Sequence, residues 1–136
     1  MTSMLFTNHI LTRAPQSTVR RLLADPLNLP AWATAITTVA KTATGYVLQR
    51  SGAVFNQPEE LHVTVQDSQV VYHSTGGQLA YDVVFTITPR GSQTAVQEEM
   101  RLTATPPRWL PLSLVLPGMQ RDFQRKLDQF ATLAEA

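Results

Sequence analysis

The chain has 136 residues, of which 43% are hydrophobic and 15% charged, so its composition is that of a folded globular protein, and we expect a single domain spanning residues 1–136. Its formal net charge is only +1 and its Lys and Arg residues form no cluster, which argues against a nucleic-acid partner. Cysteine is absent, which excludes disulfide bonds, thiolate metal ligands and a cysteine nucleophile.

The first part of the chain predicts a strand followed by two short helices. Residues 4–12 are rich in β-branched and aromatic side chains, and we favour the face of this strand that carries Phe6 as the inward one. Pro15 suits the first position of a helix that the next proline would end, and Asn28 can cap a second helix. Two helices this short form a brace beside a sheet, because parallel strands need longer crossover connections.

The middle of the chain predicts six strands joined by short turns. Apolar residues alternate most regularly between Leu79 and Ile87, which is the period of a strand that buries one face. The short connections imply an antiparallel meander. The predicted strands are Thr37–Lys41, Tyr46–Arg50, Leu61–Gln66, Gln69–Ser74, Leu79–Thr88 and Thr94–Thr103.

The C-terminal segment predicts one long amphipathic helix, because its large apolar residues recur every three or four positions. They are Met119, Phe123, Leu127 and Phe130, followed by Leu133 or Ala134. Such a helix needs an apolar concave surface to cover, and the preceding strands are the candidate. Pro117 should kink this helix or mark its start, because proline removes a helical hydrogen bond. Residues 106–116 would then form a lid-like loop or a short helix at the mouth of a cavity.

No stretch of the sequence predicts secretion or membrane insertion. The N-terminus lacks a basic region followed by an apolar run. The longest apolar stretch, residues 109–117, is broken by prolines and a serine and is too short to cross a bilayer. We therefore expect a cytoplasmic protein with no integral membrane segment, either a monomer or a homodimer.

The order of these elements, together with particular residues, resembles the START-like or SRPBCC superfamily, which has the helix-grip fold of the birch pollen allergen, and most closely its polyketide cyclase/dehydrase-like branch. The residues that carry the resemblance are Ala14-Pro15, Val19, Leu22, Asp25-Pro26, Leu29-Pro30, Trp32, Gly45, Pro89-Arg90-Gly91, Thr94, Leu127 and Leu133. The resemblance implies an α+β fold in which a seven-stranded curved antiparallel sheet grips the long helix across its concave face. It also implies a cavity between them for a hydrophobic or amphipathic ligand, with no cofactor and no catalytic signature to carry over.

Glu98 is the first residue to consider for chemistry. It lies in phase with Val96, Met100 and Leu102, so unbroken alternation would point its carboxylate into the interior, where such groups are costly and often functional. A slip or bulge would instead leave it in water at the sheet edge. Because Glu99 adjoins it and only one of the two can point inward, we slightly favour the exposed position. Glu98 is therefore a weak catalytic candidate.

Aromatic and sulfur-containing side chains are the other candidates for a ligand site. The set is Trp32, Tyr72, Tyr81, Phe85, Met100, Trp109, Met119 and Phe123. Tyr and Trp combine an apolar body with a polar group that can orient a ligand. For Phe85, Met119 and Phe123, ordinary core packing is the better interpretation.

Two further polar residues could face the interior. Asn8 is in phase with Phe6, and Arg50 is in phase with Tyr46 and Leu48. An inward arginine could bind a ligand carboxylate or pair with Glu98, although a solvated strand end is the favoured interpretation for Arg50.

The sequence predicts no metal site. His9, His62 and His73 are the only histidines, and the alternation of their strands favours outward positions. A metal centre needs several converging ligands, and no paired histidine motif is present.

Three functions remain open. The first is binding or carriage of a hydrophobic small molecule such as a lipid, a polyketide or an aromatic metabolite. The second is a polyketide aromatase or cyclase-like enzyme that uses Glu98 and pocket tyrosines. The third is a protein-interaction module with residues 109–116 as an exposed apolar patch. Because no catalytic constellation is evident, the sequence favours the non-enzymatic binder.

Overall fold

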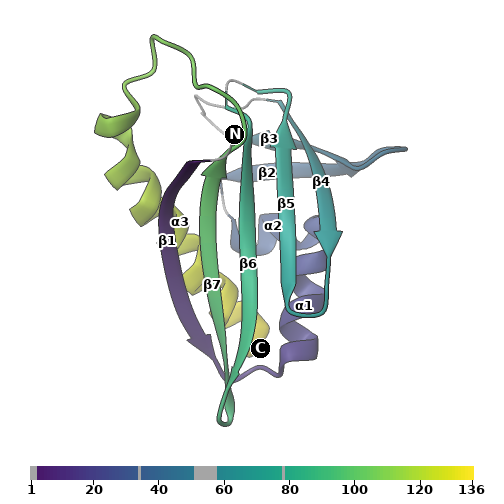
Figure 1. Ribbon diagram of the computed structural model, residues 1–136. Coiled ribbons are helices and arrows are strands. Elements are labelled where there is room, and N and C mark those ends of the chain that lie inside the picture. The colour runs from purple at the N-terminus through teal and green to yellow at the C-terminus, as the bar shows by residue number, and fades with distance from the viewer. Residues whose placement is uncertain (1–2, 34, 51–57, 78) are drawn as a thin grey trace.

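The computed structural model describes residues 3–33, 35–50, 58–77 and 79–136. In this part of the chain seven strands form one antiparallel sheet, in which β2 to β7 follow one another as a meander and β1 lies beside β7 (Figure 1). The strands are β1 Ser3–Thr12, β2 Ile36–Lys41, β3 Tyr46–Arg50, β4 Glu59–Val65, β5 Gln69–Thr75, β6 Tyr81–Arg90 and β7 Gln93–Leu102. The predicted α+β architecture is confirmed.

Burial alternates along the long strands as the sequence pattern predicts. In β7 every second residue from Thr94 to Leu102 is buried. In β1 the inward face carries Phe6 and Asn8, whereas Leu11 on the other face is exposed. Because successive side chains point to opposite sides of a sheet, one face of the strands supplies a continuous apolar wall.

The short helices follow β1 and brace one end of the sheet. They are α1 Gln16–Ala24, the 3₁₀ turn η1 Pro26–Asn28 and α2 Leu29–Trp32. The predicted cap at Asn28 is wrong, since its side chain makes no capping bond and its Nδ2 instead donates to Leu22 O at 3.4 Å. Asp25 caps η1, because its Oδ1 accepts the Leu27 N–H at 3.1 Å.

The C-terminal helix α3, Leu112–Ala134, begins before Pro117, so the prediction that it could start there is wrong. The proposed lid segment is divided, with residues 106–111 outside the helix and residues 112–116 forming its first turns. Proline removes one helical N–H. Around Pro117 the helix is partly in water, since Ser113, Leu114 and Gly118 are exposed, and an exposed carbonyl that loses its helical partner can bond to solvent instead.

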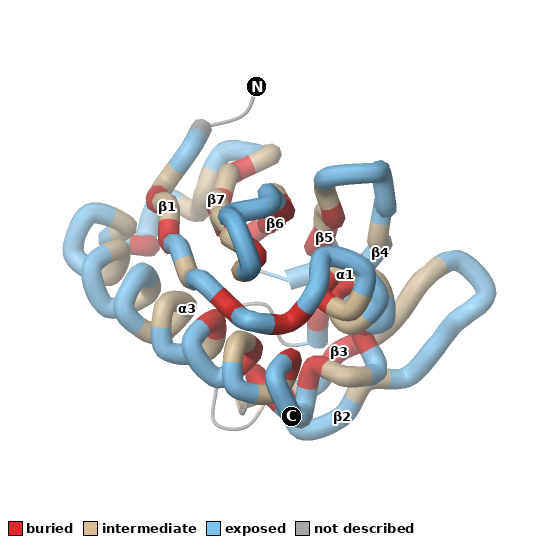
Figure 2. Tube along the Cα trace, turned by 90° about the horizontal axis from the view of Figure 1, so that it is seen from below, coloured by how far each residue is buried: buried red, intermediate tan, exposed pale blue. Residues whose placement is uncertain are grey.

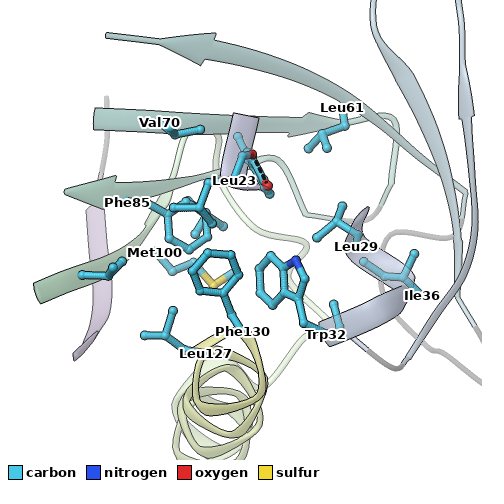
Figure 3. Packing of buried hydrophobic residues seen from close by; sticks show 14 of the residues in the cluster. Leu23, Leu29, Trp32, Ile36, Leu61, Val70, Phe85, Met100, Leu127 and Phe130 are labelled. Carbon is cyan, nitrogen blue, oxygen red and sulfur yellow. Dashed lines mark hydrogen bonds between the residues drawn. The ribbon is translucent and has the colours of Figure 1, made fainter. Parts of the chain in front are cut away.

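The helix α3 lies along the concave side of the sheet, and the buried residues gather between the two layers (Figure 2). Leu127 and Phe130 are fully buried on the face of α3 that meets the sheet. Trp32 of α2 packs edge-on against Phe130 at 5.1 Å and against Phe85 of β6 at 6.4 Å between ring centroids (Figure 3). One indole therefore connects the brace, the sheet and α3.

Truncating Phe130 should therefore weaken the fold more than truncating an exposed residue of the same helix. Phe130→Ala removes a fully buried ring and should lower the free energy of unfolding by about 3–5 kcal/mol in urea denaturation. Leu114, which is 79% exposed, provides the control, and Leu114→Ala should change it by no more than about 0.5 kcal/mol. Equal effects of the two variants would contradict the docking of α3 by its C-terminal half.

Candidate functional site

A cavity of about 50 Å³ lies among α2, α3 and the inward face of the sheet. Most of its lining is aliphatic or aromatic. Its walls are Leu29, Trp32, Ala33, Ile36, Leu48, Arg50, Glu59, Leu61, Tyr72, Tyr81, Val83, Phe85, Glu98, Phe123 and Lys126. A cavity of this volume holds a few water molecules or a small part of an organic ligand.

Six of the nine predicted ligand-binding residues line this cavity. They are Trp32, Tyr72, Tyr81, Phe85, Glu98 and Phe123. The other three lie elsewhere: Met100 is fully buried in the core, Met119 is half-buried against that core, and Trp109 is 62% exposed. Trp109 falls in the loop between β7 and α3, where no strand period constrains its direction.

A polar cluster centred on Glu59 forms part of the cavity wall. Glu59, at the start of β4, is fully buried, and its carboxylate pairs with the Arg50 guanidinium. The hydroxyls of Ser74 and Tyr81 both donate to Glu59 Oε2 at 2.8 Å. Tyr81 in turn accepts a longer hydrogen bond, 3.4 Å, from Arg50 Nη2. Burial, reinforced by the charge of Glu59, raises the pKa of Tyr81 to about 12 and keeps the phenol a donor.

The favoured interpretation of Arg50 as a solvated strand end is wrong. Its side chain is only 16% exposed and pairs with Glu59, and Glu98 is not its partner. The cause is the strand pairing, because β3 and β4 are antiparallel with Leu48 opposite Glu59, and Arg50, two residues after Leu48 on the same face of β3, is the diagonal neighbour of Glu59.

Glu59 is a residue that sequence reasoning missed. The predicted strand began at Leu61, two residues late, and so excluded it. The available signal was phase, because Glu59 shares the inward face with Leu61 and Val63.

Glu98 lines the cavity from the centre of β7 and is only 2% exposed, so the slightly favoured exposed position is wrong. The irregularities of strand pairing lie at Met4/Phe6 and Ile36/Thr38, and β7 stays in phase through Glu98. Its neighbour Glu99 points to the outer face and pairs with Arg101 at 2.8 Å. Of the two adjacent acids, Glu98 therefore faces the cavity and Glu99 faces the outer side of the sheet.

The environment of Glu98 favours its neutral form. Burial raises its pKa to about 8, although a hydrogen bond from Asn8 and the positive charge of Lys126 both act to lower it. Asn8, directly opposite Glu98 in the register, donates from Nδ2 to Glu98 Oε1 at 3.2 Å and also to the backbone oxygen of Gln120 in α3 at 3.2 Å. Near neutral pH this carboxyl can give or take a proton within a mainly apolar cavity.

The two other polar aromatic residues of the wall differ in how their polar groups are satisfied. Tyr72 donates its hydroxyl to Leu23 O at 2.5 Å, and burial raises its pKa. The indole N–H of Trp32 is buried, and no hydrogen-bond partner for it is found in the described part of the chain. Tyr72 therefore presents mainly its ring to the cavity, whereas Trp32 keeps an unused donor.

The histidines lie outside this site. His9 and His62 are exposed, and His73 bonds through Nδ1 to Asp82 at 2.9 Å on the outer face of the sheet. Among the described residues no group of three or more His, Cys, Asp or Glu side chains could hold a metal ion. Within the same residues no helix is long and apolar enough to span a bilayer.

Comparison with known proteins assigns the chain to a family. The family model described as "Polyketide cyclase / dehydrase and lipid transport" matches residues 4–135. The chain belongs to this family. The predicted resemblance to the polyketide cyclase/dehydrase-like branch of the SRPBCC superfamily is thereby confirmed, and no match was found among curated proteins.

Three solved structures resemble this polyketide cyclase/dehydrase family member along nearly its whole length. Protein XoxI from Bacillus cereus is 16% identical, with a TM-score of 0.73 and coverage of 94% of this chain and 93% of that one. Ara h 8.0201 is 12% identical, with a TM-score of 0.67 and 98% coverage of both chains. Protein CV1439 from Chromobacterium violaceum is 17% identical, with a TM-score of 0.68 and coverage of 99% of this chain and 98% of that one. These likenesses support the predicted helix-grip fold.

The raised pKa of Glu98 should make the stability of the protein fall as the pH rises. In the unfolded chain this carboxyl ionises near 4.5, whereas in the folded protein it keeps its proton up to about 8, so its contribution is fully present below the first value and is lost as the pH rises through the second. At about 1.4 kcal/mol per pH unit, wild type should lose up to several kcal/mol of unfolding free energy relative to Glu98→Gln across this window.

Urea denaturation at a series of pH values measures this difference. Glu60→Gln, at an exposed acid of β4 that does not line the cavity, should follow the wild-type curve. Parallel curves for wild type and Glu98→Gln would show that folding does not raise the pKa of Glu98 and would contradict the prediction.

Proposed function

We propose that this chain binds a hydrophobic or amphipathic small molecule, such as a lipid, a polyketide or an aromatic metabolite, in the cavity between the sheet and α3. The single observation that carries the proposal is an apolar cavity between layers that are otherwise closely packed. An unfilled space of this size costs about 1 kcal/mol of stability, because its lining loses packing contacts. The family description, which includes lipid transport, supports the same proposal.

The wall formed by α3 decides how large a guest can enter. Phe123 and Lys126 border the cavity from this helix, and both are only partly buried. The Lys126 ammonium lies 5.5 Å from the Phe123 ring centroid and 2.8 Å from Asp122 Oδ2 at the helix surface. A guest of more than a few heavy atoms would displace the side chains of Phe123 and Lys126 toward solvent. The strands on the opposite side of the cavity are rigid and do not allow a similar displacement.

Filling the cavity should weaken binding without disturbing the surface. Ala33 lines the cavity and is 4% exposed, whereas Ala31, two residues earlier, is exposed, so Ala33→Leu and Ala31→Leu form a matched pair. The neutral fluorophore 1-aminoanthracene should bind wild type and Ala31→Leu saturably, and Ala33→Leu about tenfold or more weakly, in a fluorescence titration. Lack of saturable binding to wild type, or equal binding to both variants, would contradict the proposal.

A second candidate function is that of a cyclase-like enzyme, and the environment of Glu98 favours it. A carboxyl with a pKa of about 8 is matched to proton transfer near neutral pH. In its neutral form it can protonate a carbonyl oxygen, and in its ionised form it can remove a proton from a carbon between two carbonyls. If so, Glu98→Gln would stop aromatisation of a short poly-β-ketone while leaving 1-aminoanthracene binding intact, and wild type without turnover would count against this function.

The third function, an interaction module, has weaker support. Trp109 and Leu114 do face solvent, at 62% and 79% exposure. The interaction hypothesis, however, is strongest for a fold whose cavity is filled by its own side chains, and this cavity is not filled.

A further inference from the structure

The wall of the cavity contains two polar atoms whose hydrogen-bonding capacity is unused. Trp32 Nε1 is buried without a partner in the described part of the chain, although a buried N–H is costly to leave unpaired. Figure 3 shows this nitrogen turned toward the side where Leu29 and Leu61 line the cavity. The second atom is Glu98 Oε2, since within the same residues the hydrogen bond of this carboxyl is made through Oε1.

The other polar side chains of the wall each have at least one partner among the described residues. Glu59 accepts from Arg50, Ser74 and Tyr81, and Tyr72 donates to a backbone oxygen. Lys126 is paired with Asp122. Trp32 Nε1 and Glu98 Oε2 are therefore available to a ligand in the described part of the wall.

Both available atoms act as donors near neutral pH. An indole nitrogen can only donate. Because Asn8 donates to Glu98 Oε1, the proton of the neutral carboxyl belongs on Oε2, which then donates as well. The titratable groups that face Glu98 are Lys126 from α3 and Tyr72 from β5, with Arg50, Glu59 and Tyr81 on the wall of the same cavity; Asn8 from β1 carries no charge.

We propose that the cavity selects a compact, mainly apolar molecule that carries a carbonyl oxygen, which accepts hydrogen bonds from Trp32 Nε1 and Glu98. A carbonyl oxygen has two lone pairs and no proton, so it can accept hydrogen bonds from both donors and itself needs no acceptor in the wall. A site with buried donors rejects an analogue that lacks the acceptor, because the donors then stay unpaired. This inference rests on the proposed binding function and defines the chemical class of its ligand.

The test compares two ligands of the same shape. Cyclopentanone and methylenecyclopentane differ only in having C=O or C=CH₂. Wild type at about pH 6.5, where Glu98 is neutral, should bind the ketone about tenfold more tightly than the alkene in an NMR titration. Binding of neither would refute the cavity as a site. Equal binding of both would leave the binding function intact and refute the carbonyl preference.

The role of Trp32 can be read directly in the same titration. The chain has two tryptophans, so two indole N–H signals are expected, and Trp109→Phe, at an exposed loop position, assigns them. The ketone should move the Trp32 signal downfield and slow its exchange with solvent, whereas the alkene should do neither. A Trp32 signal that responds equally to both ligands would overturn its assignment as the donor.

The role of Glu98 can be read from the pH dependence of the preference. Above about pH 8.5 the carboxyl has lost its donor proton and repels a carbonyl oxygen, so the preference of wild type for the ketone should shrink several-fold. Glu98→Gln keeps an N–H donor at every pH, and its preference should stay constant. A wild-type preference that does not change with pH would remove Glu98 from the proposal.

Discussion

The contact of the Trp32 indole with Phe85 and Phe130 is the interaction on which the arrangement of this protein depends. These three residues come from α2, β6 and α3, and their edge-on packing fixes the distance between the helix and the sheet. Because large aromatic side chains hold the layers apart at this point, the smaller residues beside them leave a space. The cavity is thus a consequence of how the layers are joined, and two of the joining residues, Trp32 and Phe85, also form part of its wall.

Carboxyl groups in the wall of an apolar cavity have to be stabilised without water, and this protein stabilises its two in different ways. Glu59 is surrounded by three donors, including the Arg50 guanidinium, so that its charge is compensated within the wall. Glu98 has one neutral donor and a more distant cation, and burial instead favours its protonated form. The two carboxyls therefore have separate roles: one holds strands β3 to β6 together, and the other remains available for chemistry or recognition.

The sequence predicted the elements well because their signals are local. Period-two burial in β6 and β7 and the apolar stripe of α3 follow from side-chain spacing alone. The errors concern properties that depend on distant residues. The position of Glu98 required knowing that Asn8, ninety residues earlier, would lie opposite it, and the position of Arg50 required the pairing of β3 with β4. The prediction that the C-terminal helix could start at Pro117 was wrong because the hydrogen bond that this proline removes lies in a turn that is partly in water.

The side-chain nitrogen of Asn8 donates hydrogen bonds to two partners from different layers, Glu98 on the sheet and the Gln120 carbonyl on α3. Few side chains of this size can replace it: serine offers a single proton, and aspartate offers none and would set a second acid beside the first. Natural variation at this position should therefore be narrow wherever the acid on β7 is kept. Residue 8 can serve as a marker that separates relatives sharing this interior chemistry from relatives sharing only the overall shape.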